Sequence, residues 1–325
     1  MRRRDFIKAV AGSAMTWPLV VRAQQPAMPV IGFLTPVLQI EEHLRGFQQG
    51  LQHASFVEGD SVSILYRSAD NEIDRFPALA MELARRAVAL IVTVGNAASL
   101  AAKNATATIP VLFVSADNPV KLGLVPSLAR PGGNLTGVNL LATELVAKRL
   151  ALLRELLPTA ARVAVLVDPT NKTITEPTLQ GVEAAARAMA LQIQVLNASN
   201  GPEISAAFAA LERERPDALF VSIGALFTAR RAQLATLAVR HMIQMTSGNR
   251  QITEAGGLMS YGANITDALH QVGVYAGRIL KGEKPADLPV VQATKFELVI
   301  NAETARMFGL TVPPSLLTTA DEVIE

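Results

Sequence analysis

Short hydrophobic runs alternate along the chain with segments in which hydrophobic residues recur every three or four positions. The runs predict buried strands, because a strand covered on both faces is apolar at nearly every position. The second pattern predicts amphipathic helices. Strands are predicted at residues 30–34, 62–66, 89–94 and 109–114, with helices at 44–54, 76–83 and 96–103 between them. This alternation is typical of a parallel sheet with connecting helices.

The same pattern restarts after residue 143. Helices are predicted at 144–157, 179–189, 203–213 and 229–240, and strands at 163–167, 192–196, 218–223 and 242–246. A third section adds strands at 257–261 and 296–300, a helix at 267–281, and a helix at 301–308 with Asn301 as its N-cap. Pro313-Pro314 is expected to end regular structure. The chain is therefore predicted to be an α/β protein with two doubly wound, Rossmann-like lobes of roughly 100 residues or more each.

Two glycine pairs lie where one lobe is predicted to end and the other to begin. The stretch ARPGGNLTGVN, residues 129–139, is followed by extended chain, whereas a phosphate-binding loop leads directly into a helix. A similar Gly-Gly pattern recurs at 256–264. Gly133, Gly137, Gly257 and Gly262 are the predicted hinge residues, because glycine absorbs changes in backbone angle. The predicted lobes are residues 29–137 plus 262–286, and residues 138–258 plus 290–325.

The N-terminus has the pattern of an export signal. Arg3-Arg4-Asp5-Phe6-Ile7-Lys8 resembles the twin-arginine signal, with Arg2 where that signal has Ser or Thr. An apolar run from Ala9 to Val21 follows, which is too short for a helix that needs about 20 residues to span a bilayer. Cleavage is predicted after Ala23, and the mature chain is expected in the periplasm. The twin-arginine and general secretory routes both remain open.

Composition narrows the function further. The 325 residues include no cysteine, which excludes disulfides, thiolate metal sites and a cysteine nucleophile. Five basic residues and one acid fall in the first 23 residues, so the remainder has 25 basic and 27 acidic residues. The mature chain is slightly acidic, and no nucleic-acid partner is expected.

Motifs for catalysis are missing from the sequence. Strand one is not followed by G-x-G-x-x-G, and neither a P-loop nor a G-x-S-x-G elbow occurs. The four histidines stand singly and are expected to be surface or helix-packing residues. We therefore expect a protein that is not an enzyme and has no metal or cofactor.

Several long stretches together resemble one family. They include IPVLFVSADNPVKLGLVPSLARPGGNLTGVN, AKRLALLRELLP, VAVLVDPTN, GGLMSYGAN and GRILKGEKPADLPVVQATKFELVIN. The chain resembles the periplasmic substrate-binding proteins of ABC transporters, of the tryptophan/tyrosine-binding type. The resemblance implies a type I periplasmic binding protein fold, with two lobes joined by three hinge crossings. It also implies a monomer that binds a small-molecule ligand between the lobes and delivers it to a membrane permease driven by an ATPase.

Candidate ligand-binding residues follow from the positions of the cleft loops in such a fold. They are Thr35, Pro36, Gly95, Asn96, Ala97, Ser115 and Asp117 in lobe one, Asp168, Asn171, Gly224, Phe227 and Asn249 in lobe two, and Asn139 and Tyr261 near the crossings. Asp117 and Asp168 are candidates to contact a ligand ammonium or hydroxyl, although turn and cap roles are equally compatible with their positions. Asn96 is also expected to cap the following helix, and Phe227 is compatible with a core position. With one or two carboxylates and no well-placed arginine, the cleft favours an aromatic or branched hydrophobic amino acid, or a related aromatic acid.

A two-lobed α/β scaffold also suits three other functions. An enzyme on the same scaffold would need an acid/base set that the sequence does not show. A repressor with this lobe architecture would need a DNA-binding segment of about 50 residues before strand one. An exported sensor that presents its ligand to a membrane receptor is compatible with the sequence.

Overall fold

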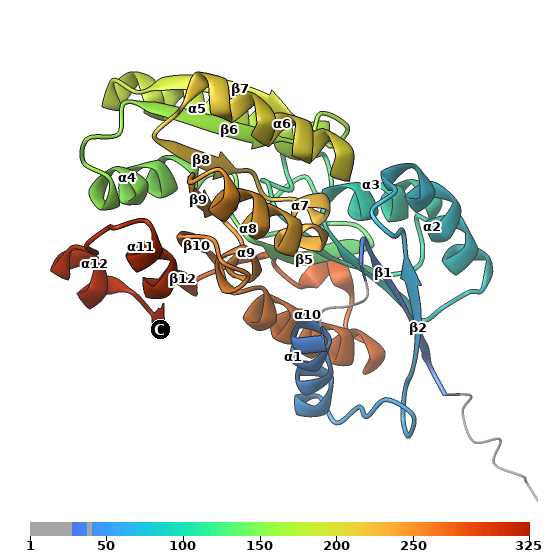
Figure 1. Ribbon diagram of the computed structural model, residues 1–325. Helices are drawn as coiled ribbons and strands as arrows, with labels where there is room; N and C mark the ends of the chain where they lie inside the picture. Colours follow the sequence, from blue (N-terminus) through green and yellow to red (C-terminus); the bar gives the residue numbers. More distant parts are fainter. Residues whose placement is uncertain (1–27, 38–40) are drawn as a thin grey trace, which may run out of the picture.

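The computed structural model describes residues 28–37 and 41–325 and consists of two lobes, each built on its own sheet (Figure 1). We define lobe one by the first sheet and the helices that cover it. Its strand order is β11-β5-β4-β3-β1-β2, and every neighbouring pair is parallel. The strands are β1 (Val30–Thr35), β2 (Ser63–Ser68), β3 (Leu90–Val94), β4 (Val111–Ser115), β5 (Leu135–Asn139) and β11 (Val291–Gln292).

Lobe two is built on the second sheet, with the order β13-β12-β10-β9-β8-β6-β7. Its pairs are parallel except for the antiparallel pair of β10 and β12. The strands are β6 (Arg162–Val167), β7 (Gln192–Asn197), β8 (Ala218–Val221), β9 (Gln244–Ser247), β10 (Met259–Ala263), β12 (Phe296–Asn301) and β13 (Glu322–Ile324).

Helices cover both faces of each sheet. In lobe one they are α1 (Glu41–His53), α2 (Phe76–Arg85), α3 (Asn96–Ala105) and α10 (Ile265–Leu280), with short 3-10 turns at Ile73–Arg75 and Pro285–Asp287. In lobe two they are α4 (Val146–Leu156), α5 (Lys172–Met189), α6 (Gly201–Glu214), α7 (Ala225–Ala229), α8 (Arg231–Arg240), α9 (Arg250–Glu254), α11 (Ala302–Met307) and α12 (Pro314–Thr319). This is the doubly wound α/β architecture that the sequence predicts.

The chain passes between the lobes three times. It leaves lobe one after β5, returns after β10 and leaves again after β11. The sheets place all of β5 and β11 in lobe one and all of β10 in lobe two. The lobe boundaries predicted from the sequence, at 137/138, at 258–262 and at 286–290, lie within or next to these three strands.

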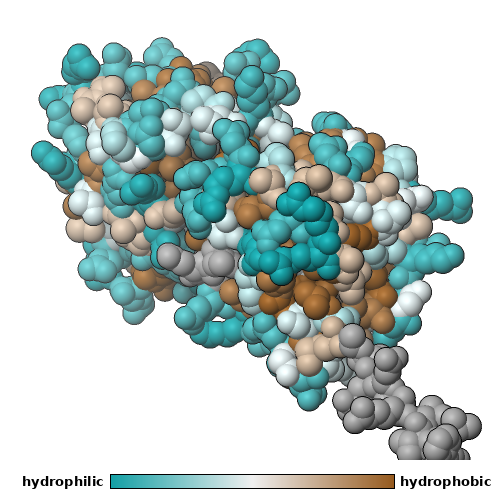
Figure 2. All heavy atoms as spheres, turned by 90° about the vertical axis from the view of Figure 1, so that its right-hand side faces the viewer, coloured by the Kyte–Doolittle hydropathy of each residue, from teal (hydrophilic) through white to brown (hydrophobic). Residues whose placement is uncertain are grey.

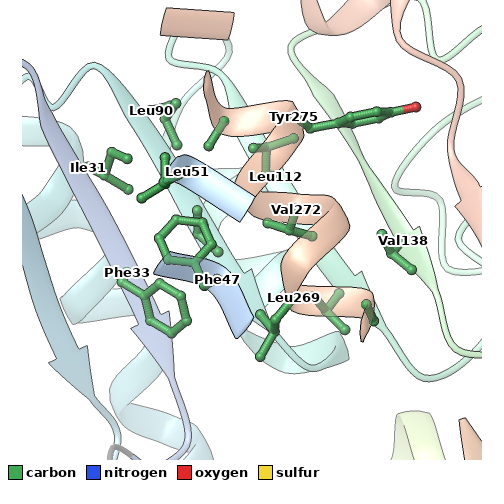
Figure 3. Packing of buried hydrophobic residues seen from close by; sticks show 14 of the residues in the cluster. Ile31, Phe33, Phe47, Leu51, Leu90, Leu112, Val138, Leu269, Val272 and Tyr275 are labelled. Atoms are coloured by element: carbon green, nitrogen blue, oxygen red, sulfur yellow. The ribbon is translucent and has the colours of Figure 1, made fainter. Parts of the chain in front are cut away.

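Each sheet has a separate hydrophobic core on each of its faces. Figure 3 shows the core between the lobe-one sheet and helices α1 and α10, where Phe33, Phe47 and Leu269 pack together. The Phe33 and Phe47 rings have centroids 5.2 Å apart. Tyr275 lies at the edge of this core, and its hydroxyl donates to the Pro289 carbonyl oxygen at 2.9 Å. The core thus ties α10 to the segment that leads into β11.

Helices α1 and α10 approach each other closely because glycines line their contact. A Cβ atom at Gly46 would lie 2.5 Å from the Thr266 carbonyl oxygen, and one at Gly50 would overlap the His270 carbonyl oxygen. Gly273 on α10 faces the same contact and has no space for a side chain against the backbone of α1. Glycine therefore sets the distance between these two helices.

We expect Gly50→Ala to lower the free energy of unfolding by about 1–3 kcal/mol, because the new methyl group meets backbone that cannot rotate away. In an unconstrained helix the same change would raise the free energy of unfolding by about 1 kcal/mol. A decrease would therefore show that the close contact between the helices outweighs helix propensity. Chemical denaturation followed by circular dichroism measures the effect. Gly133→Ala is the control, because a Cβ atom there has no neighbour within 4 Å. An unfolding midpoint for Gly50→Ala equal to that of the control would contradict the contact.

The structure differs from the sequence prediction at several prolines and short helices. Helix α5 begins at Lys172 and contains Pro177, so it starts earlier than its apolar pattern indicated. The prediction that Pro313-Pro314 ends regular structure is wrong, because α12 begins at Pro314 and β13 follows. Proline is tolerated in a first helical turn, where its missing N–H has no intrahelical partner anyway. The predicted cap at Asn301 is confirmed, since its side chain accepts from the Thr304 amide at 2.8 Å.

Of the four predicted hinge glycines, two lie within strands. A Cβ atom at Gly137 in β5 would overlap the Phe113 carbonyl oxygen, and one at Gly262 in β10 would overlap that of Gly248. Close backbone approach therefore explains glycine at both positions. Gly133 and Gly257 lie outside the strands. The hinge role of all four stays a prediction.

Hydrophilic residues dominate the face shown in Figure 2, with hydrophobic residues between them. Among the residues that the structure describes, no helix combines the length and apolarity that a membrane crossing requires. The predicted signal peptide, residues 1–23, lies outside the described residues.

Candidate functional site

A cavity of about 210 Å³ lies between the lobes. Its walls come from loops at the carboxyl ends of β1 and β3 in lobe one, and of β6, β8 and β9 in lobe two. Open α/β sheets bind their ligands at this end of the strands, because the loops diverge there and leave space. The interlobe cavity is therefore the candidate functional site.

The lobe-one wall includes Thr35 and Pro36 after β1 and Gly95-Asn96-Ala97 at the start of α3. Gly95 has a φ of +94°, a backbone conformation that favours glycine. The expectation that Asn96 caps α3 is wrong, because Gly95 holds the cap position. The Asn96 side chain instead accepts from the Ala116 amide at 2.9 Å and donates to the Thr173 carbonyl oxygen at 3.4 Å. Since Thr173 belongs to α5, this amide connects the two lobes.

The lobe-two wall includes Asp168, Asn171, Gly224 and Asn249. Asp168 follows β6, and its Oδ1 accepts from the Thr170 amide at 3.0 Å and from the Thr170 hydroxyl at 2.7 Å. Asn249 is the N-cap of α9, and its Oδ1 accepts from the Gln251 amide at 3.3 Å. Polar groups on this wall are thus held in place by short-range hydrogen bonds.

Hydrophobic side chains form much of the remaining wall. They come from both faces of the lobe-one sheet, from the start of α10 and from the loops of lobe two. They are Phe33, Val37, Leu44, Ile73, Phe76, Val94, Val114, Leu140, Ile174, Ile223, Leu226, Ile265 and Leu269. A cavity with an apolar lining and a few fixed polar groups suits a small ligand that is largely apolar.

Five of the candidate residues do not line this cavity. Phe227 is fully buried in the lobe-two core, and Tyr261 stacks on Phe296 with ring centroids 6.3 Å apart. Asp117 is 8% exposed, and its Oδ1 accepts from the Thr143 hydroxyl at 2.8 Å. Ser115 and Asn139 end paired strands β4 and β5 and are fully buried. The other nine candidates line the cavity together.

His43 lines the cavity and was not among the candidates. Its Nε2 lies 3.1 Å from the Nε2 of Gln251, so α1 of lobe one meets α9 of lobe two at this point. Burial lowers the pKa of His43 to about 4, and the imidazole is therefore neutral at physiological pH. In the sequence His43 is a single histidine near a helix start, and nothing there signals the second lobe.

Arg149 is a second residue that the sequence did not single out. It is 1% exposed and lies on α4 behind the cavity wall. Its Nε donates to the Tyr261 carbonyl oxygen at 2.7 Å, and its Nη2 donates to the Ala142 carbonyl oxygen at 2.8 Å. Burial lowers the pKa of Arg149 to about 10, and the group remains charged at neutral pH. Ala142 follows strand β5, at the first crossing, and Tyr261 lies in β10, the strand before the second crossing, so this one side chain connects the chain near both crossings.

The geometry of the fold and the cavity by itself defines a class of protein. Two doubly wound lobes enclose a cavity, and the polar groups that described residues place on its wall are one carboxylate, several amides and hydroxyls, and a neutral imidazole. The described residues contain no group of three or more His, Asp or Glu side chains placed to hold a metal ion. Fold and cavity together define a two-lobed solute-binding protein of the type I periplasmic binding protein fold.

Residues 37–324 match the family model described as ABC transporter substrate binding protein. The chain belongs to this family. It is 24% identical over 271 residues to a tyrosine-binding protein of Clostridioides difficile strain R20291, covering 83% of this chain and 77% of that protein.

Two solved structures have the same fold. One, described as an ABC domain in complex with L-Trp from Streptococcus pneumonia, has a TM-score of 0.83 and 24% identity over 91% of this chain and 99% of the other. The second, a ligand-free, open substrate-binding protein from Clostridium difficile, has a TM-score of 0.67 and 23% identity at the same coverage. The resemblance to a substrate-binding family that the sequence suggests is confirmed.

Proposed function

We propose that this protein is exported to the periplasm, binds an aromatic or hydrophobic amino acid between its lobes, and delivers it to an ABC permease. The cavity is the observation that carries the proposal, because it offers an apolar lining with one carboxylate and several neutral polar groups. The relatives described as tyrosine-binding and as a complex with L-Trp support an amino acid of this kind. The mature protein then acts as a monomer that starts at Gln24.

The arrangement of the lobes supports capture by closure. The TM-score to the complex with L-Trp is 0.83 and that to the ligand-free, open structure is 0.67, at equal coverage. The lobes also touch directly through His43 and Gln251, and through Asn96 and Thr173. A ligand in the cavity would contact both lobes and so favour this closed arrangement over a separated one.

Calorimetric titration of the mature protein with a panel of amino acids tests the proposal. We expect binding to one site, with aromatic or branched hydrophobic members binding more tightly than charged ones. Sugars serve as the control class. Heat with a sugar and none with any amino acid would overturn the assignment.

A further inference from the structure

The cavity wall is unbalanced in charge. Asp168 is the one carboxylate among the described residues that line it, and no described lysine or arginine lines it. His43, the remaining titratable side chain on the wall, is kept neutral by burial. A ligand that enters the cavity therefore meets a net negative charge.

Asp168 lines the cavity and carries this negative charge. Its Oδ1 accepts both hydrogen bonds from Thr170, whereas its Oδ2 accepts none from a described residue. The residue follows β6 directly, so the end of a buried strand fixes its position. A carboxylate whose second oxygen is free can accept a charge-assisted hydrogen bond from an ammonium group.

Arg149 does not neutralise this charge at the wall. Its guanidinium is buried behind the cavity, and its hydrogen bonds go to the carbonyl oxygens of Ala142 and Tyr261. It lies against Gly248 after β9, whereas Asp168 follows β6, and β8 separates these two strands. Neighbouring strands lie about 4.8 Å apart, so the ends of β9 and β6 are separated by about 10 Å.

We propose that Asp168 is the specificity-determining residue and that the cavity recognises the ammonium group of its ligand. The ligand class is then hydrophobic primary amines, with or without an α-carboxylate, and aromatic acids that lack the amine are excluded. This inference rests on the proposed function and narrows it. An acid would place a second negative charge near Asp168 in a site of reduced dielectric, where like charges repel strongly. The carboxylate of an amino acid is accommodated by neutral donors such as the Asn171 amide.

Three indole ligands that differ in charge test the inference by calorimetry at pH 7.5. They are L-tryptophan, tryptamine, which lacks the carboxylate, and indole-3-propionate, which lacks the amine. We expect the wild-type protein to bind L-tryptophan and tryptamine, and to bind indole-3-propionate at least tenfold more weakly. Asp168→Asn should lower the affinities for L-tryptophan and tryptamine tenfold or more. The difference between these affinities and that for indole-3-propionate should therefore become smaller.

Asp168→Asn keeps an oxygen that can accept both Thr170 hydrogen bonds, so the loop should retain its shape. Asp60→Asn is the matched control, because Asp60 is exposed and does not line the cavity. Thermal unfolding of both variants checks that they are folded.

Equal affinity of the wild-type protein for indole-3-propionate and tryptamine would overturn the inference while leaving an interlobe site for hydrophobic ligands. Unchanged tryptamine affinity in Asp168→Asn would overturn it as well. If no indole binds, the same charge series is run with leucine, isoamylamine and 4-methylpentanoate. Failure of both series would overturn the proposed function, and this inference with it.

Discussion

Arg149→Ala is expected to lower the free energy of unfolding by about 3–5 kcal/mol and to weaken ligand binding as well. The side chain is among the largest that are fully buried, so its truncation leaves a cavity. It also leaves the carbonyl oxygens of Ala142 and Tyr261 without their present donors, at a cost of about 1–3 kcal/mol each. Relief of the burial of a charge offsets part of this loss.

Loss of the hydrogen bonds to the two carbonyl oxygens is the reason why this variant should also bind ligand more weakly. Ala142 follows the first crossing between the lobes, and Tyr261 lies in the strand before the second. Arg149 therefore holds the two crossings at a fixed separation. Once this connection is lost, the closed arrangement should become less favourable than the separated one. Ligand affinity should therefore fall by more than the smaller fraction of folded protein accounts for.

Two further variants separate volume, charge and hydrogen bonding at this site. Arg149→Met restores most of the volume without donors, and Arg149→Lys restores the charge without the planar donor geometry that spans two carbonyl groups. Urea denaturation and calorimetry measure stability and affinity for all three variants. If Arg149→Met is as stable as the wild type and binds ligand equally well, the two hydrogen bonds contribute neither to stability nor to closure of the lobes.

Ligand affinity is expected to fall about 20- to 30-fold between pH 7.5 and pH 5 because His43 must be neutral in the closed form. Burial holds the pKa of His43 at about 4, against an ordinary value of 6.5. When the lobes separate, the imidazole regains water and its pKa rises toward the ordinary value. The open form then binds a proton that the closed form excludes.

Because the pKa of His43 is higher in the open form than in the closed form, affinity falls as the pH is lowered. At pH 7.5 and above, the imidazole is almost fully neutral in both forms, and affinity no longer depends on the protonation of His43. Between pH 6.5 and pH 4 the open form is increasingly protonated, and closure must expel that proton. Arg250 and Glu42 line the small pocket next to His43, and Arg250 keeps its charge throughout because of its ion pairs with Glu254, Glu297 and Glu322.

Calorimetry with L-tryptophan between pH 7.5 and pH 5 measures the dependence. His43→Gln removes the titrating group and should give a flat profile, with a modest loss of affinity at neutral pH. His241→Gln is the matched control, because His241 does not line the cavity. A wild-type profile as flat as that of His43→Gln would show that His43 does not titrate with closure.

Much of the fold could be predicted from the sequence because each buried strand is a continuous apolar run. The elements that were missed are short. Helices α7 and α9 have five residues each, too few for a periodic pattern to appear. The proline pair at 313–314 predicts an end of regular structure, but Pro314 is the first residue of helix α12.

Nine of the predicted site residues line the cavity, since they lie on loops at the ends of strands, where topology alone fixes position. Whether the other predicted residues reach the cavity depends on the direction of their side chains, which the sequence does not give. Phe227 is on the unforeseen helix α7 and turns into the core. Tyr261 lies inside β10, whereas Ala263 at the end of that strand reaches the cavity. His43 and Arg149 each contact a partner more than 100 residues away in the chain. The partner of Arg149 is Tyr261, 112 residues away, and the partner of His43 is Gln251.

The three crossings also constrain how the chain folds. Strands β6 to β9, which are four neighbouring strands at one side of the lobe-two sheet, come from one continuous segment, residues 162–247. Lobe one, by contrast, needs α10 to complete its core and β11 to complete its sheet, and both are encoded near the C-terminus. A chain emerging from the ribosome can therefore assemble strands β6 to β9 of lobe two first. The N-terminal strands stay incomplete until about nine-tenths of the chain has been made, and stopping synthesis after β5 would leave the surface for α10 exposed.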